Sequence, residues 1–243
     1  MLKLIGLMLF VGIIGFGSNW QEGLTVTSYQ YSNIADSSRV ENILQCTLSG
    51  EDHLYVQLAQ QNYALTDIKV GGIGWRHALN KNDYMLSSYS AGLYTNGQVS
   101  HTGTLAWGSG DPSRSMGLSA QVALYPSSYW TFALSPSYGW PLGNDWRIDF
   151  GSTWSGAKDT SGLSGFAGLM MNWGSNWQTG FKCQTGYAAN ELLPENGVVN
   201  FSAYYGTLAW HMDAIRVSYT AEWYQNSAQN SGRTQSLGGS ISF

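Results

Sequence analysis

The chain has 243 residues, a formal net charge of −4 and 11% charged residues, against about 25% in an average soluble domain. This deficit argues against an ordinary soluble enzyme and against a disordered chain, and no basic cluster indicates nucleic acid or anionic lipid as a partner. Glycine, tyrosine and tryptophan are abundant, but a mean hydropathy of −0.17 does not favour helical membrane spans.

The first 17 residues have the layout of a secretory signal peptide. Lys3 supplies a positive start, residues 4–16 form an apolar run, and Gly15 and Gly17 fit the small positions before a cleavage site. A membrane anchor is the alternative, but the run is shorter than the roughly 20 residues that a spanning helix needs. We therefore expect an exported chain whose barrel domain covers residues 18–243.

After this segment, apolar and polar side chains alternate with a period of two in repeated stretches of about ten residues, separated by turn-forming residues. This pattern is typical of the strands of an antiparallel, up-and-down transmembrane β-barrel. About 14 segments are present, and 12 is the alternative because the segment between Asn96 and Gly108 is short. In chain order the apolar stripes begin at Leu24, Val40, Leu54, Ile68, Met85, Val99, Met116, Trp130, Trp146, Leu163, Trp177, Val199, Ile215 and Leu237.

Two of the segments predict local irregularities. The apolar phase of the fourth segment changes between Val70 and Ile73, which predicts a β-bulge near Gly71-Gly72. Pro136 has no N–H to donate to a ladder, so we expect a bulge or an early strand end there.

The twelfth segment has a regular apolar stripe, formed by Val199, Phe201, Ala203 and Tyr205.

Tryptophans flank short turns in the second half of the chain. Trp140 and Trp146 flank residues 141–144, Trp173 and Trp177 flank residues 174–176, and Trp210 precedes His211-Met212. Tryptophan favours the membrane–water interface, because its ring is apolar while its N–H needs a polar partner. These turns are therefore predicted to lie in the periplasmic aromatic girdle.

Longer connections alternate with these short turns and are predicted to be outer loops. They cover residues 157–162, 188–197 and 226–232, and bacterial outer-membrane barrels have short periplasmic turns and longer outer loops. The alternative fold is a soluble β-sandwich, which would have to hide the apolar stripes between two sheets.

The last segment alternates apolar and small polar residues up to the final aromatic. Side chains alternate across a strand, so its apolar face carries Leu237, Gly239, Ile241 and Phe243. This segment resembles the closing strand of bacterial outer-membrane β-barrels, which commonly ends in Phe. The resemblance implies that the barrel-assembly machinery recognises this strand as an assembly signal. In a closed barrel it must pair with the first strand, around Leu24 and Val26.

A few charged residues fall on the polar face, which we assign to the barrel lumen. They are Arg147, Asp149, Lys182, Arg216 and Glu222. One interpretation is a selective constriction that lines a pore, since rings of charge set selectivity. The alternative is a set of interior ion pairs that plug and stiffen the barrel. Neither sign of charge dominates, so even a pore is expected to show little ion preference.

No arrangement of residues indicates catalysis or a cofactor site. His53, His77, His101 and His211 lie on separate segments without a nucleophile pattern. His211 and Asp213 supply two candidate metal ligands, which is short of a closed site.

Cys46 and Cys183 lie on apolar stripes of strands that are not neighbours. A disulfide needs Cα atoms within roughly 7 Å, so we expect two free thiols.

Several short motifs resemble the YaiO-like family of outer-membrane barrels. They are Tyr63-Ala-Leu-Thr-Asp67-Ile-Lys-Val, then Gly-Ile-Gly-Trp75-Arg-His-Ala-Leu79 with Tyr84, and the turn Asn172-Trp-Gly-Ser-Asn-Trp177. The resemblance implies an outer-membrane barrel and carries no reaction or catalytic residues with it.

The sequence therefore predicts a non-enzymatic integral outer-membrane β-barrel, without cofactor or metal, that contacts membrane lipid and lipopolysaccharide as a monomer. Its predicted role is a scaffold in envelope or surface-polysaccharide processes. A porin-like channel for passive diffusion of small solutes is the second hypothesis, and an outer-membrane lipid-modifying enzyme is the third.

Overall fold

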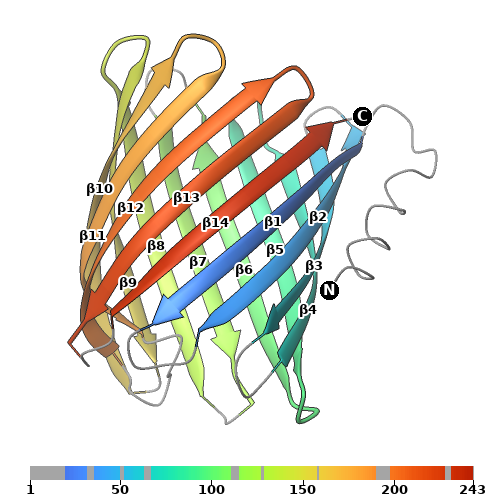
Figure 1. The fold of residues 1–243 in the computed structure, drawn as a ribbon, viewed down its shortest axis with the longest axis vertical. Helices are drawn as coiled ribbons and strands as arrows, with labels where there is room; N and C mark the ends of the chain where they lie inside the picture. Colours follow the sequence, from blue (N-terminus) through green and yellow to red (C-terminus); the bar gives the residue numbers. More distant parts are fainter. Residues whose placement is uncertain are drawn as a thin grey trace.

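A computed structural model describes residues 20–31, 36–49, 52–62, 67–110, 115–126, 129–157, 159–189, 198–227 and 231–242. These residues form one closed antiparallel β-barrel of fourteen strands (Figure 1), so the predicted fold class and strand number are confirmed. The strands are β1 (Trp20–Tyr31), β2 (Ser37–Ser49), β3 (Asp52–Asn62), β4 (Asp67–Ala78), β5 (Asp83–Tyr94), β6 (Val99–Ser109), β7 (Ser115–Leu124), β8 (Trp130–Pro141), β9 (Trp146–Ala157), β10 (Thr160–Trp173), β11 (Trp177–Ala189), β12 (Val198–Met212), β13 (Ile215–Asn226) and β14 (Ser231–Ser242).

The barrel closes between its first and last strands, as predicted. Leu24 pairs with Gly239 and Val26 with Leu237, along a register that continues without a shift from Gln21 to Tyr31. Closure matters because an open sheet edge would leave backbone N–H and C=O groups without partners. Phe243 and the predicted signal segment lie outside the described residues.

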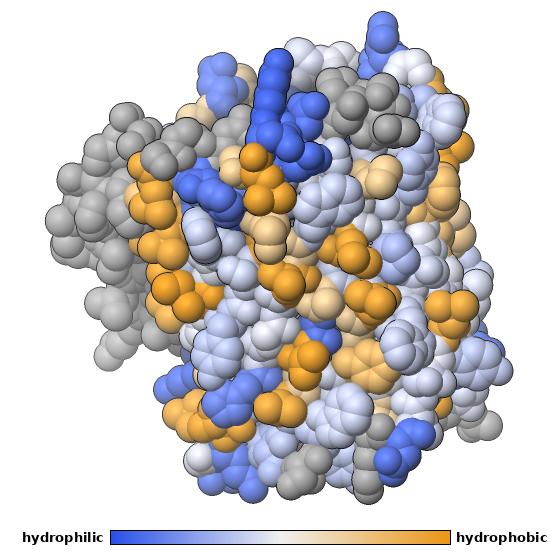
Figure 2. Space-filling view, turned by 180° about the vertical axis from the view of Figure 1, so that it is seen from behind, coloured by the Kyte–Doolittle hydropathy of each residue, from blue (hydrophilic) through white to orange (hydrophobic). Residues whose placement is uncertain are grey.

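The two faces of the wall differ in chemistry, because successive side chains of each strand point to opposite sides. Large apolar side chains on the outer face are strongly exposed, among them Leu105, Leu163, Phe181 and Leu237. Apolar residues are spread over the outer wall in Figure 2. The inner face carries mainly Ser, Thr, Gln, Gly and Tyr side chains.

The two ends of the barrel can be named from the chain. β1 begins and β14 ends at one end, which we call the terminal rim and which lies at the top of Figure 1. The opposite end is the distal rim. The terminal rim carries the three turns with flanking tryptophans. There the Trp177 and Trp210 rings lie 6.5 Å apart, and Trp173 Nε1 donates to Thr179 Oγ1 at 2.9 Å.

The predicted bulge at Gly71-Gly72 is wrong. β4 pairs with β3 and with β5 in one uninterrupted register. The phase changes because Val70 faces the lumen whereas Ile73 faces outward and is 51% exposed. The lumen wall near the distal rim accepts an apolar side chain, so the apolar residues of this segment do not all lie on the lipid face. A real register shift lies elsewhere, between Thr47 and Ser49 where β2 pairs with β3.

Pro136 neither ends its strand nor shifts its register. β8 continues to Pro141, and its pairing with β7 is continuous. On the β9 side the ladder skips Ser135 and Pro136 and resumes at Ser137 with unchanged register. The missing N–H therefore costs local pairing only, and the Ser135 hydroxyl contacts the Thr153 hydroxyl at 2.9 Å across the gap.

Two further expectations about the second half differ from the structure. The stripe of β12 faces inward, because Phe201 is 7% exposed whereas Tyr204 is 59% exposed on the outer face. The expected long loop after residue 157 is a tight turn, since Ala157 pairs directly with Thr160. Both cysteines are free: Cys46 lies on β2 and Cys183 on β11.

Candidate functional site

The candidate site is the barrel lumen, because polar and charged side chains of the strands converge there. Barrels of about eight strands are filled by their own side chains, whereas those of about 16–18 strands leave an aqueous channel. The fourteen strands of this barrel lie between these two cases.

The structure places all five sequence-predicted charges on the inward face of strands β9, β11 and β13. Arg147 and Asp149 lie near the terminal rim, where Arg147 Nε donates to Asp149 Oδ1 at 2.7 Å. Arg216 lies beside the terminal rim and lines a recess with His211. Glu222 lies six residues further along the same strand, so it is not brought together with Arg216.

Three of these charges share one row across the wall. The register pairs Asp149 with Gly168, Gly168 with Lys182, Lys182 with Tyr205, and Tyr205 with Glu222. Residues that pair directly across antiparallel strands have neighbouring side chains. Lys182 is therefore flanked by a carboxylate two strands away on each side.

Lys182 is held by aromatic rings and makes no ion pair with a described residue. Its amine lies 4.4 Å from the centroid of the Phe166 ring and 5.3 Å from that of Tyr205. Cations are attracted to the faces of such rings. The amine borders a recess in the wall with a volume of about 260 Å³, whose lining includes Phe166, Gly168, Met170, Gly180 and Tyr205.

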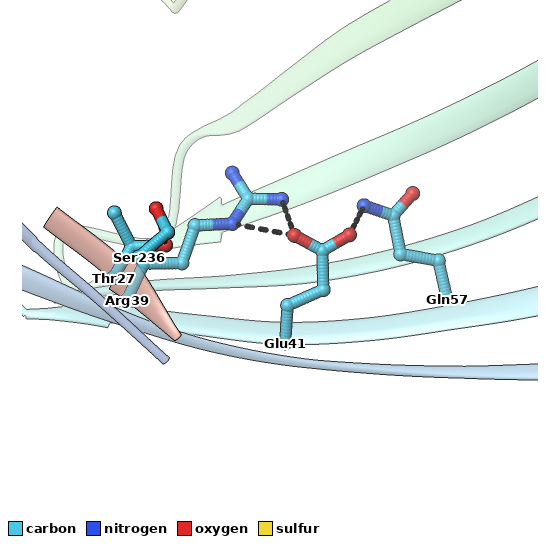
Figure 3. A network of polar contacts seen from close by, with 5 residues as sticks. All are labelled: Thr27, Arg39, Glu41, Gln57 and Ser236. Carbon is cyan, nitrogen blue, oxygen red and sulfur yellow. Dashed lines mark hydrogen bonds and ion pairs between the residues drawn. The ribbon is translucent and has the colours of Figure 1, made fainter. Parts of the chain in front are cut away.

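A second charged cluster was missed in the sequence (Figure 3). Arg39 Nη2 lies 3.0 Å from Glu41 Oε2, and Gln57 donates to the other oxygen of the same carboxylate. Nearby, the Thr27 and Ser236 hydroxyls lie 3.0 Å apart across the β1–β14 closure. The sequence contained a pattern that could have found this cluster, since Arg39 and Glu41 alternate with the outward apolar stripe that begins at Val40 and therefore fall on the lumen face.

Arg76 is the remaining inward-facing basic residue on the described strands. Its guanidinium carbon lies 4.4 Å from the centroid of the Tyr84 ring. With it, the inward cations are Arg39, Arg76, Arg147, Lys182 and Arg216, against the carboxylates Glu41, Asp149 and Glu222. The described lumen wall therefore carries a small excess of positive charge, in contrast to the balance expected from the sequence.

Aromatic side chains lie flat on the lumen wall where glycines leave room. A Cβ built on Gly74 would come within 2.0 Å of the Tyr55 ring, and one built on Gly108 within 2.5 Å of the Tyr84 ring. These glycines keep both tyrosines against the wall instead of projecting into the lumen.

The histidines lie apart, as their spacing indicated. His77 Nδ1 lies 3.0 Å from Asp52 Oδ1, and His101 Nδ1 lies 2.6 Å from the Tyr89 hydroxyl. Both pairs are on the outer face. In the part of the chain that the structure describes, no group of three or more His, Cys, Asp or Glu residues could hold a metal ion.

No family model and no curated protein matches the sequence. Solved structures with a similar fold include the CymD monoaromatic hydrocarbon channel, at a TM-score of 0.69 and 10% identity over 94% of this chain and 89% of that one. A bacterial polysaccharide outer membrane secretin is similar at 0.67 and 10%, over 94% and 100% of the two chains. The Acinetobacter baumannii outer membrane protein Omp33 is similar at 0.54 and 11%, over 94% and 100%.

These likenesses define the class of fold: the chain is built as a bacterial outer-membrane β-barrel. At this level of identity they carry the architecture alone. No described helix has the length and apolarity to cross a membrane.

Proposed function

We propose that the protein is an outer-membrane, porin-like channel through which small hydrophilic solutes diffuse passively. We place the terminal rim in the periplasm and the distal rim on the outer side of the membrane. Both chain termini of an even-stranded barrel lie on the same side, which is the periplasm in bacterial outer-membrane barrels. The exposed apolar outer face then contacts lipid, and the polar inner face contacts water.

The observation that carries this proposal is the direction of the lumen's polar contacts. Both inward ion pairs, Arg39–Glu41 and Arg147–Asp149, join residues two positions apart on one strand. The inward side-chain hydrogen bonds from Gln57 to Glu41 and between Thr207 and Thr220 join adjacent strands. A plugging network would instead bridge opposite walls. These contacts run along the wall, between positions of one strand or of adjacent strands.

Planar-bilayer recording of the refolded mature chain tests the proposal. A stable open conductance that scales with salt concentration supports the channel. A silent bilayer, from protein whose gel mobility still shifts on heating, contradicts it and favours the scaffold in envelope or surface-polysaccharide processes.

The finer hypotheses from the sequence stay predictions. The YaiO-like resemblance rests on short motifs, and the absence of enzymatic activity is part of our proposal. Incubation with purified lipid A followed by mass spectrometry tests that point, since loss of acyl chains would reveal a lipid-modifying enzyme.

A further inference from the structure

A recess on the outer wall near the distal rim brings aromatic, cationic and hydrogen-bonding side chains together. It spans β12, β13, β14 and β1 and has a volume of about 530 Å³. Its lining combines two aromatic rings, one guanidinium and several hydrogen-bonding side chains, and the outward-facing members are Gln30, Ser202, Tyr204, Trp223, Gln225, Ser231 and Arg233.

The strand register builds this recess from two neighbouring rows. Tyr204 pairs with Trp223, Trp223 with Arg233, and Arg233 with Gln30, all on the outer face. The row nearer the rim contains Ser202, Gln225 and Ser231. Because these positions are fixed by barrel pairing, the polar groups lie side by side on a rigid wall.

Arg233 is the charged group of this surface. Its guanidinium carbon lies 6.0 Å from the centroid of the Trp223 ring, and it forms no ion pair with any residue that the structure describes. The side chain is exposed. An outward arginine on a lipid-facing wall is costly in the hydrocarbon layer but favourable at the level of the head groups.

We propose that this recess binds the phosphorylated head group of an outer-leaflet glycolipid. The Arg233 guanidinium takes the phosphate, for which its planar donors are well suited. The Trp223 and Tyr204 rings pack against the sugar, and the Gln and Ser side chains offer hydrogen bonds to its hydroxyls. This inference rests on the proposed membrane orientation, which puts the distal rim in the outer leaflet.

Native mass spectrometry of the refolded chain with diphosphoryl lipid A tests this site. The wild type is expected to retain one lipid, and Arg233→Gln to lower the retained fraction at least about tenfold, because a charge-assisted hydrogen bond is lost. Arg233→Lys keeps the charge without the planar fork and is expected to fall between them. The matched control is Lys69→Gln, since Lys69 is also exposed on the outer face near the distal rim but lies on β4.

Two further binding measurements identify which part of the lipid the recess recognises. Dephosphorylated lipid A is expected to bind the wild type as weakly as the phosphorylated lipid binds Arg233→Gln, and inorganic phosphate at equal concentration is expected not to displace the lipid. Equal retention by the wild type, Arg233→Gln and Lys69→Gln would overturn the site, as would equal retention of the dephosphorylated lipid or displacement by inorganic phosphate.

Conductance in phosphatidylcholine bilayers that lack this glycolipid separates this inference from the channel proposal. An open channel without lipid retention overturns the lipid site alone. A silent bilayer with lipid retention overturns the channel alone.

Discussion

The amine of Lys182 lies over the face of the Phe166 ring, at 4.4 Å from its centroid, and no described carboxylate neutralises it through an ion pair. Packing against the Phe166 and Tyr205 rings holds the lysine side chain on the lumen wall. Gly168, which lies between Asp149 and Lys182 in the same row, leaves the space that the amine borders.

The first prediction concerns ion selectivity. The described wall carries more cations than carboxylates, so the open channel is expected to prefer chloride over potassium by roughly twofold, because charges lining a pore set selectivity. Lys182→Gln is expected to reduce this preference, measured as reversal potential in a salt gradient. Lys69→Gln removes an equal charge from the outer face and should leave the potential unchanged. A shift of the same size in both variants would show that Lys182 does not face the permeating ions.

A second prediction uses the glycine beneath Tyr55. Gly74→Ala places a Cβ where the end of the Tyr55 ring lies, and the ring can swing away because it is the far end of a side chain. We expect lower single-channel conductance with little loss of stability. Gly71→Ala is the matched control, since a Cβ there meets nothing within 4 Å on the outer face. Unchanged conductance in Gly74→Ala would mean that Tyr55 does not line the conducting path.

The third prediction concerns the Arg39–Glu41–Gln57 cluster, whose two charged side chains are 25% and 20% exposed. Glu41→Gln leaves Arg39 without its carboxylate and is expected to lower the free energy of unfolding by about 1 kcal/mol, as for a partly buried charged hydrogen bond. Urea unfolding in lipid vesicles measures this change. The same variant adds net positive charge to the lumen, so its chloride preference should rise. A fall in chloride preference would contradict the inward placement of this pair.

The sequence was sufficient for the architecture because a period of two is a strong signal when lipid covers one face. The alternation predicted about 14 strands, with 12 as the alternative, and the inward placement of Lys182, while the closed-barrel class required β14 to pair with β1. The stripe failed to indicate the lipid face in two places, at Val70 of β4 and along the β12 stripe, and the two failures share one cause. Near the distal rim the inward positions of β12 accept Phe201, so an apolar stripe there does not indicate lipid.

Contacts between side chains were harder to predict than the face of the barrel wall on which each side chain lies. The pairing of Arg147 with Asp149 could be expected because the two residues are two positions apart on one strand. The Lys182–Phe166 contact could not, because it depends on which strand residues are neighbours across the β10–β11 register. Alternation fixes the face of each residue, whereas register fixes its partners.

A fourth prediction concerns assembly. Deletion of Phe243 is expected to lower the amount of folded protein in the outer membrane, because the closing strand is the segment that we expect the assembly machinery to recognise. Heat-modifiable protein in membrane fractions is the measurement, with Ser242→Ala as a control that keeps the terminal aromatic. Equal folded protein from the deletion and the control would remove Phe243 from the assembly signal.

The last prediction tests which face of the wall meets lipid, using adjacent residues in the middle of β7. Leu118 is 45% exposed on the outer face, whereas Ser119 points into the lumen and pairs with Ser135 of β8. Leu118→Lys places an ammonium in the hydrocarbon layer and is expected to cost about 2–4 kcal/mol of unfolding free energy in lipid vesicles. Ser119→Lys places the same charge in water and is expected to change stability little while raising chloride preference. Equal destabilisation by both variants would contradict the assignment of the two faces, since only one of the lysines should meet lipid.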